Sequence, residues 1–237
     1  MDDSPSRLAR REQHRKRNRI IAIVGGIVVV VAAVIAVVVI AGGGGDSKSA
    51  STTSTTADHQ NSVNLPLGPV TADSAGATVT VTPDQAQQIL GVLGKYVQGA
   101  TVEPLRSGKP ITADLSAVFD PGTLARATTI DRGVVLDEGL PKVTGKLTVD
   151  AQPITMVGLG DQTGKLTLVS AAVLLDVNGQ TQEKGGPLKL VRKADFVFAP
   201  NEFGVWQVTA YSMVVTRAGA GLDAPTTSST STTGAKK

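Results

Sequence analysis

The sequence contains no cysteine. This absence excludes a disulfide framework, a thiol nucleophile and thiolate metal ligands. The two histidines, His14 and His59, lie outside residues 78–217, which contain all seven aromatic residues. This part of the chain therefore lacks the usual general base of enzymes that act at neutral pH. It also contains no glycine-rich phosphate loop, no HExxH and no GxSxG. The sequence predicts no enzymatic activity and no catalytic, cofactor-binding or metal-binding residue.

One apolar run is long enough to cross a membrane. It extends from Ile20 to Ala41 without a charged or amide side chain. As a helix it reaches roughly 33 Å, whereas the hydrocarbon core of a bilayer is about 30 Å thick. A cleaved signal peptide has an apolar core of only about 7 to 15 residues. We therefore expect an uncleaved transmembrane anchor, with cleavage near residues 37–45 as the alternative.

The charges beside this run predict its orientation. Arg15, Lys16, Arg17 and Arg19 stand immediately before it, whereas Lys48 is the one basic residue among the thirty that follow it. The positive-inside rule then leaves the N-terminus in the cytoplasm and places the rest of the chain outside the plasma membrane. We interpret the basic residues as a topology signal that also contacts anionic membrane lipids, not as a nucleic-acid-binding arm.

The composition divides the chain into five parts. These are a basic cytoplasmic head (1–19), a transmembrane helix (20–41), a flexible linker rich in Gly, Ser and Thr (42–77), a folded extracytoplasmic domain (78–217) and a disordered tail (218–237). The folded domain contains 13 basic and 13 acidic residues. Its balanced charge gives no indication of a nucleic-acid partner.

Within the domain, helical patterns come first and strand patterns follow. Thr82 and Gln85 form a predicted capping box at the start of a helix of about 15 residues. Two shorter helices are expected near residues 113–119 and 120–128. Four strand patterns follow Pro141. In the first of them the apolar residues occupy odd-numbered positions before Pro153 and even-numbered positions after it, which indicates a bulge or bend there. The predicted fold class is α+β, a cone-like domain of one long and two short helices packed on a curved four-stranded antiparallel meander.

The order of these elements resembles the nuclear-transport-factor-2-like fold, above all in the final hairpin "ADFVFAPNEFGVWQVTAYSMVVTR". With the basic head, the apolar run and the Ser/Thr-rich linker, the architecture is similar to single-pass bacterial envelope proteins of the actinobacterial, mammalian-cell-entry-associated type. The resemblance implies a cone that encloses an apolar ligand in some members and an isomerase or hydratase site in others. It also implies self-association through the face of the sheet.

Three side chains are the pocket candidates: Tyr96 and Tyr211, whose phenols can donate to an oxyanion, and Asp176, within an apolar strand. The competing interpretation is structural. Tyr96 falls in the apolar stripe of the predicted long helix, and a charged residue on an antiparallel strand usually faces solvent, as expected of Asp195. The strand that contains Asp176 is apolar on both faces, which equally allows burial under helices or against a partner. The paired carboxylates of residues 136–139, "LDEG", are interpreted as a turn in preference to a metal site.

Three functions remain open on the sequence alone. The first is a membrane-anchored accessory or scaffold protein of the cell envelope, which binds a partner complex without catalysis. The second is a domain that binds a lipid or another small apolar ligand for envelope transport. The third is a pocket isomerase or hydratase, which the scarcity of catalytic side chains disfavours.

Overall fold

The computed structural model describes residues 61–74, 76–110, 112–181, 186–219, 222 and 226–231. The predicted anchor from Ile20 to Ala41 and the topology signal of Arg15, Lys16, Arg17 and Arg19 lie outside these residues. Among the described residues, no helix is both long and apolar enough to span a membrane. The elements below all belong to one compact unit, residues 57–237.

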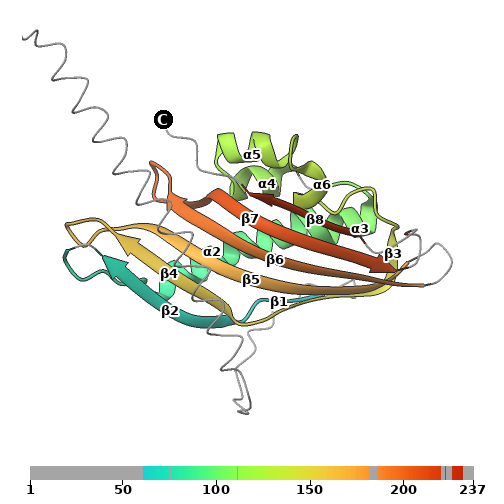
Figure 1. Ribbon diagram of the computed structural model, residues 1–237, viewed down its shortest axis with the longest axis horizontal. Helices are drawn as coiled ribbons and strands as arrows, with labels where there is room; N and C mark the ends of the chain where they lie inside the picture. Colours follow the sequence, from blue (N-terminus) through green and yellow to red (C-terminus); the bar gives the residue numbers. More distant parts are fainter. Residues whose placement is uncertain are drawn as a thin grey trace, which may run out of the picture. The chain divides into compact units, whose positions relative to one another are not determined.

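A mixed sheet of eight strands forms the framework of this unit (Figure 1). Its strands are β1 (Asn61–Asn64), β2 (Leu67–Ser74), β3 (Val143–Ala151), β4 (Ile154–Gly160), β5 (Leu166–Thr181), β6 (Pro187–Pro200), β7 (Trp206–Gly219) and β8 (Thr226–Ser231). The strand order is β1-β3-β5-β6-β7-β8, while β4 pairs with both β2 and β5. β1 and β2 run parallel to their partners β3 and β4, and the other pairs are antiparallel.

β3 and β4 lie end to end along one edge of β5. β3 pairs with the second half of β5 and β4 with the first half, so the two strands act as one strand with a break between them. The break falls at Gln152 and Pro153, where proline has no N–H to contribute to the ladder. The bend predicted at Pro153 is confirmed.

Six helical segments lie between β2 and β3 in the described chain. The predicted helix is confirmed as α2 (Pro83–Val97), with both hydrogen bonds of the capping box between Thr82 and Gln85. The chain continues without a break through a π-helix, η1 (Gln98–Val102), into α3 (Glu103–Ser107). The remaining helices are α4 (Thr112–Val118), α5 (Pro121–Ala127) and α6 (Arg132–Val135).

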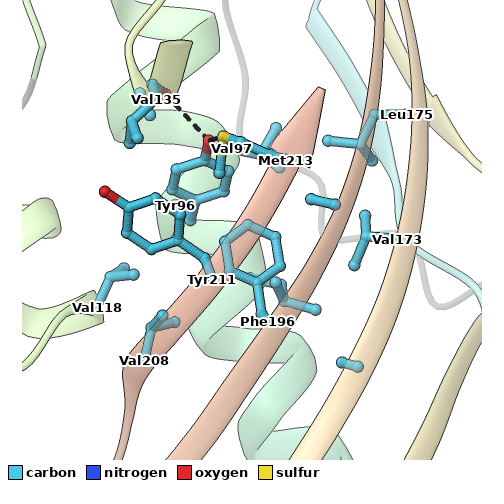
Figure 2. Packing of buried hydrophobic residues seen from close by; sticks show 14 of the residues in the cluster. Tyr96, Val97, Val118, Val135, Val173, Leu175, Phe196, Val208, Tyr211 and Met213 are labelled. Carbon is cyan, nitrogen blue, oxygen red and sulfur yellow. Dashed lines mark hydrogen bonds between the residues drawn. The ribbon is translucent and has the colours of Figure 1, made fainter. Parts of the chain in front are cut away.

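The core lies between these helices and one face of the sheet, here called the helix-covered face. Figure 1 shows α2 running along this face and α4, α5 and α6 gathered beside β7 and β8. Aromatic rings fill the centre: the Tyr96 ring lies 5.2 Å from that of Phe196 and 5.9 Å from that of Phe119, both edge to face. Figure 2 shows Tyr96, Phe196 and Tyr211 side by side in this packing. Such ring pairs stabilise a core beyond the area that they bury.

The predicted fold class is wrong. The four predicted strand regions are present as β3 with β4, β5, β6 and β7, but they belong to an eight-stranded mixed sheet and not to a four-stranded antiparallel meander. The additional strands come from residues 61–74, within the predicted linker, and 226–231, within the predicted tail. Residues 226–231 are all Ser or Thr and have no apolar pattern, and residues 61–74 contain two prolines, so the strand structure of both segments depends on the backbone ladder that a neighbouring strand offers.

The cap of α2 provides a test of the helix. Replacing Thr82 by alanine removes the side-chain acceptor of the Gln85 N–H, which we expect to lower the free energy of unfolding by about 1 kcal/mol. Urea unfolding of the full-length protein measures this change. Thr80→Ala is the matched control, because Thr80 is exposed just before the cap. Equal stability of the two variants would contradict a role for the capping box.

Candidate functional site

The two tyrosines predicted as pocket residues lie in the core. Tyr96 is fully buried on α2 and Tyr211 is buried on β7. The Tyr96 hydroxyl donates to the Val135 carbonyl at 3.0 Å (Figure 2), and the Tyr211 hydroxyl donates to Asp131 Oδ2 at 3.0 Å. Burial raises the pKa of Tyr96 to about 12, and burial together with the bond to Asp131 raises the pKa of Tyr211. Both phenols are therefore neutral structural donors.

Asp176 does not join the tyrosines. Its neighbours Leu175 and Val177 point into the core, so Asp176 lies on the opposite face of β5, beside Asp150 of β3. The structure thus places Tyr96 and Tyr211 in the core and separates them from Asp176. Within the described residues, no group of three or more His, Cys, Asp or Glu side chains can hold a metal ion.

Asp131 ties the last strand to the helices. Its Oδ2 accepts from Arg126 Nε at 2.7 Å as well as from Tyr211. Burial raises the pKa of the Asp131 carboxyl, but hydrogen bonds from Thr230, Arg126 and Tyr211 outweigh this effect and leave the pKa below its usual value. Because Arg126 Nη2 also donates to the Ser231 carbonyl at 3.3 Å, Asp131 and Arg126 together hold β8 against the helical side of the domain.

The most unusual arrangement is a group of four buried polar side chains: Thr101, Asp137, Arg192 and Arg217. We call it the buried ionic cluster. Arg192 Nη2 donates to Asp137 Oδ2 at 2.7 Å, and Arg217 Nη2 donates to Asp137 Oδ1 at 2.9 Å. Thr101 Oγ1 donates to Asp137 Oδ2 at 2.8 Å and accepts from Arg192 Nη1 at 2.7 Å. Two guanidinium groups therefore share one carboxylate in the core.

The sheet register brings the two arginines together. Arg192 of β6 is paired with Val215 of β7, and Arg217 is two residues further along β7 on the same face. Diagonal neighbours of this kind are about 7 to 8 Å apart between backbones, within reach of long side chains. The two positive charges would repel each other, and Asp137 lies between them as their common partner.

The irregular turn between α2 and α3 positions the other half of the cluster. The π-helix contains Thr101, which is completely buried. Pro104 follows in α3 and has no N–H to offer the Ala100 carbonyl one turn earlier. The Asp137 N–H donates to this carbonyl at 2.9 Å instead. A helix defect thus fixes the backbone of the residue whose side chain binds both arginines.

Arg192 is also in contact with an aromatic ring. Its guanidinium carbon lies 5.5 Å from the centroid of the Tyr96 ring, within the range of a cation–π interaction. Burial lowers the pKa of Arg192, but the negative charge of Asp137 more than offsets this effect, and the pKa is raised. Arg192 therefore carries its positive charge although its side chain is almost completely buried.

The prediction from the sequence missed this cluster, although a signal for it was present. Side chains alternate between the two faces of a strand. Arg192 therefore points to the same face as the buried Leu190 and Ala194, and Arg217 points to the same face as the buried Val215. Asp137 belongs to the segment interpreted as an ordinary turn. It is 1% exposed. Its neighbour Glu138 is paired with Arg132 at the surface.

A second feature is an apolar surface at the turn between β6 and β7. Phe203 is 81% exposed and Val205 is 53% exposed. The turn is held by Asn201, whose Oδ1 accepts from the Phe203 N–H at 2.9 Å and from the Val205 N–H at 3.0 Å. Gly204 has a φ of +77°, which favours glycine at this position. We call residues 201–205 the apolar hairpin tip.

Comparison with known proteins finds no matching family model, no matching curated protein and no matching solved structure.

The two buried phenols allow a direct test of this core. Tyr96 and Tyr211 are the only tyrosines of the chain. Ultraviolet absorbance of the folded protein should therefore show no tyrosinate at pH 10 to about 11, whereas both ionise near pH 10 once the chain is unfolded in urea. Because the folded pKa of Tyr96 is raised, its contribution to stability is complete below pH 10 and declines as the pH rises toward 12.

Urea unfolding at pH 9 and pH 11 measures this decline. Tyr96→Phe removes one ionisable group and should reduce the pH dependence, since Tyr211 alone then remains. A tyrosinate signal at pH 10 that is the same in the folded and unfolded protein would contradict the burial of the two phenols.

Proposed function

We propose that the protein is a membrane-anchored accessory protein of the cell envelope, whose extracytoplasmic domain binds a partner protein without catalysis. The observation that carries this proposal is the charge-free run from Ile20 to Ala41 directly after a dense basic segment. This pattern is typical of a single-pass anchor with its N-terminus in the cytoplasm.

The contacts within the domain support a binding role over a chemical one. Three acidic or phenolic side chains of the core are held by other protein groups: Tyr96 by a backbone carbonyl, Tyr211 by Asp131, and Asp137 by two arginines. A general acid or base must reach a substrate atom at hydrogen-bond distance. These groups are held by neighbours from other elements, which suits them to maintaining the fold.

The apolar hairpin tip is the surface that we assign to the partner. An exposed aromatic residue on a turn with a fixed backbone loses little conformational freedom on binding, and aromatic residues are enriched among residues that dominate interfaces. The tip lies at the end of the sheet where β2 and β4 finish, whereas the chain enters the sheet at Asn61, beside the middle of β3. The tip therefore lies at a different part of the sheet from Asn61, where the described chain enters it.

The absence of cysteine makes the proposed topology easy to test. Single cysteines at Ser6 and at the exposed Gln162 can be labelled in intact cells with a maleimide that does not cross membranes. We expect labelling of Gln162→Cys alone, and labelling of Ser6→Cys only after the cells are permeabilised. Labelling of Ser6→Cys in intact cells, or protection of Gln162→Cys, would contradict the proposed orientation.

A photo-crosslinking amino acid at Phe203 tests the partner surface. In native membranes we expect Phe203 to crosslink to one defined protein, because its ring would lie inside the interface. The matched control is the same crosslinker at Gln162, which is exposed in the β4–β5 turn at the same end of the sheet. Equal crosslinking at both positions, or none at either, would contradict the assignment of the tip. A crosslink to a second copy of the chain would replace the accessory partner by self-association.

A further inference from the structure

The buried ionic cluster contains one more positive charge than negative charge. Arg192 and Arg217 are 1% and 6% exposed, and Asp137 is their only carboxylate partner among the described residues. The Tyr96 hydroxyl, whose pKa is raised to about 12, adds no negative charge at neutral pH. A buried charge is costly unless an opposite charge and hydrogen bonds compensate it. The cluster thus lacks one negative charge.

The hydrogen bonds of the cluster are incomplete at the same place. Arg192 uses Nη1 for Thr101 and Nη2 for Asp137, while its Nε is buried without a partner in the part of the chain that the structure describes. Arg217 uses Nε and Nη2 for Asp137. Buried donors without an acceptor are rare in folded proteins and call for an explanation.

The face of the Tyr96 ring does not replace the missing charge. The guanidinium carbon of Arg192 lies 5.5 Å from the centroid of the ring, which gives a cation–π attraction, but the ring carries no net charge. Glu138, the next carboxylate along the chain, is paired with Arg132. Neither group satisfies Arg192 Nε.

We propose that the buried ionic cluster binds one small monovalent anion, which accepts a hydrogen bond from Arg192 Nε and neutralises the second guanidinium group. Because the cluster has two positive charges and one negative charge, we expect the ligand to carry a single negative charge. Because Arg192 and Asp137 are almost completely buried, we expect a small ligand group, either a halide or the carboxylate end of a larger molecule. This site is independent of the proposed partner-binding role.

Thermal unfolding of the full-length protein in detergent tests the site. Chloride, acetate and octanoate are each titrated at constant ionic strength against gluconate, which is too bulky for a closed site. Because a ligand that binds only the folded state stabilises it, we expect a saturable rise of the midpoint. A response to chloride and acetate identifies a free anion as the ligand, and a response to octanoate alone identifies the carboxylate of an apolar molecule. No saturable response to any of the three overturns the proposal.

Arg217→Gln separates the site from general salt effects. It leaves one guanidinium opposite one carboxylate, so the variant should lose the response to the anion while it stays folded in gluconate. Arg126→Gln is the matched control, because Arg126 is paired with a different carboxylate, Asp131. Loss of the response in the control as well, or its persistence in Arg217→Gln, contradicts the assignment.

A measurement on the unaltered protein covers the case in which Arg217→Gln does not fold. Exchange of chloride with a protein site broadens the chloride NMR signal. We expect broadening by the full-length protein that acetate or octanoate reverses at a concentration similar to that at which it raises the midpoint. Absence of broadening, together with a flat acetate and octanoate titration, rules out a monovalent anion at the cluster.

Discussion

The carboxylate of Asp137 joins the helical layer to the sheet. Its two oxygens accept from the π-helix through Thr101, from β6 through Arg192 and from β7 through Arg217. Removing one partner from a buried ion pair typically costs about 3 to 5 kcal/mol, because the other charge is left without compensation. A non-specific apolar contact could not fix the relative positions of helix and sheet in this way. The cluster therefore defines how the helical layer is seated on the sheet.

The seating depends on a local irregularity. A regular helix through residues 98–107 would satisfy its own carbonyls, and Asp137 would find no backbone acceptor at Ala100. Pro104 and the π-helix provide that acceptor and present Thr101 to the carboxylate. The same residues that weaken the helix thus create the contact that holds it in place.

The elements that the sequence predicted correctly are those marked by a local sequence motif. The capping box of Thr82 and Gln85 and the interruption at Pro153 are both present, because each depends on residues close together in the chain. The sequence did not predict β1, β2 and β8, whose Ser/Thr-rich or proline-containing sequences form strands only along a neighbour. The tyrosines were identified as either pocket or core, and long-range packing decided for the core. Arg192 and Arg217 were missed because charged residues in a strand were expected to face solvent. Both alternate with solvent-facing residues in a way that places them on the buried face of the sheet.

The parallel pairing of β1 with β3 has a mechanical consequence. β1 begins at Asn61 as an edge strand that runs in the same direction as its neighbour and toward the end of the sheet that carries Phe203. A pull between Asn61 and that end is directed along the strands. Such a load shears the four residue pairs of β1 together instead of opening them one after another. The pairing of β1 with β3 therefore resists tension along the sheet more than it would resist a pull across the strands.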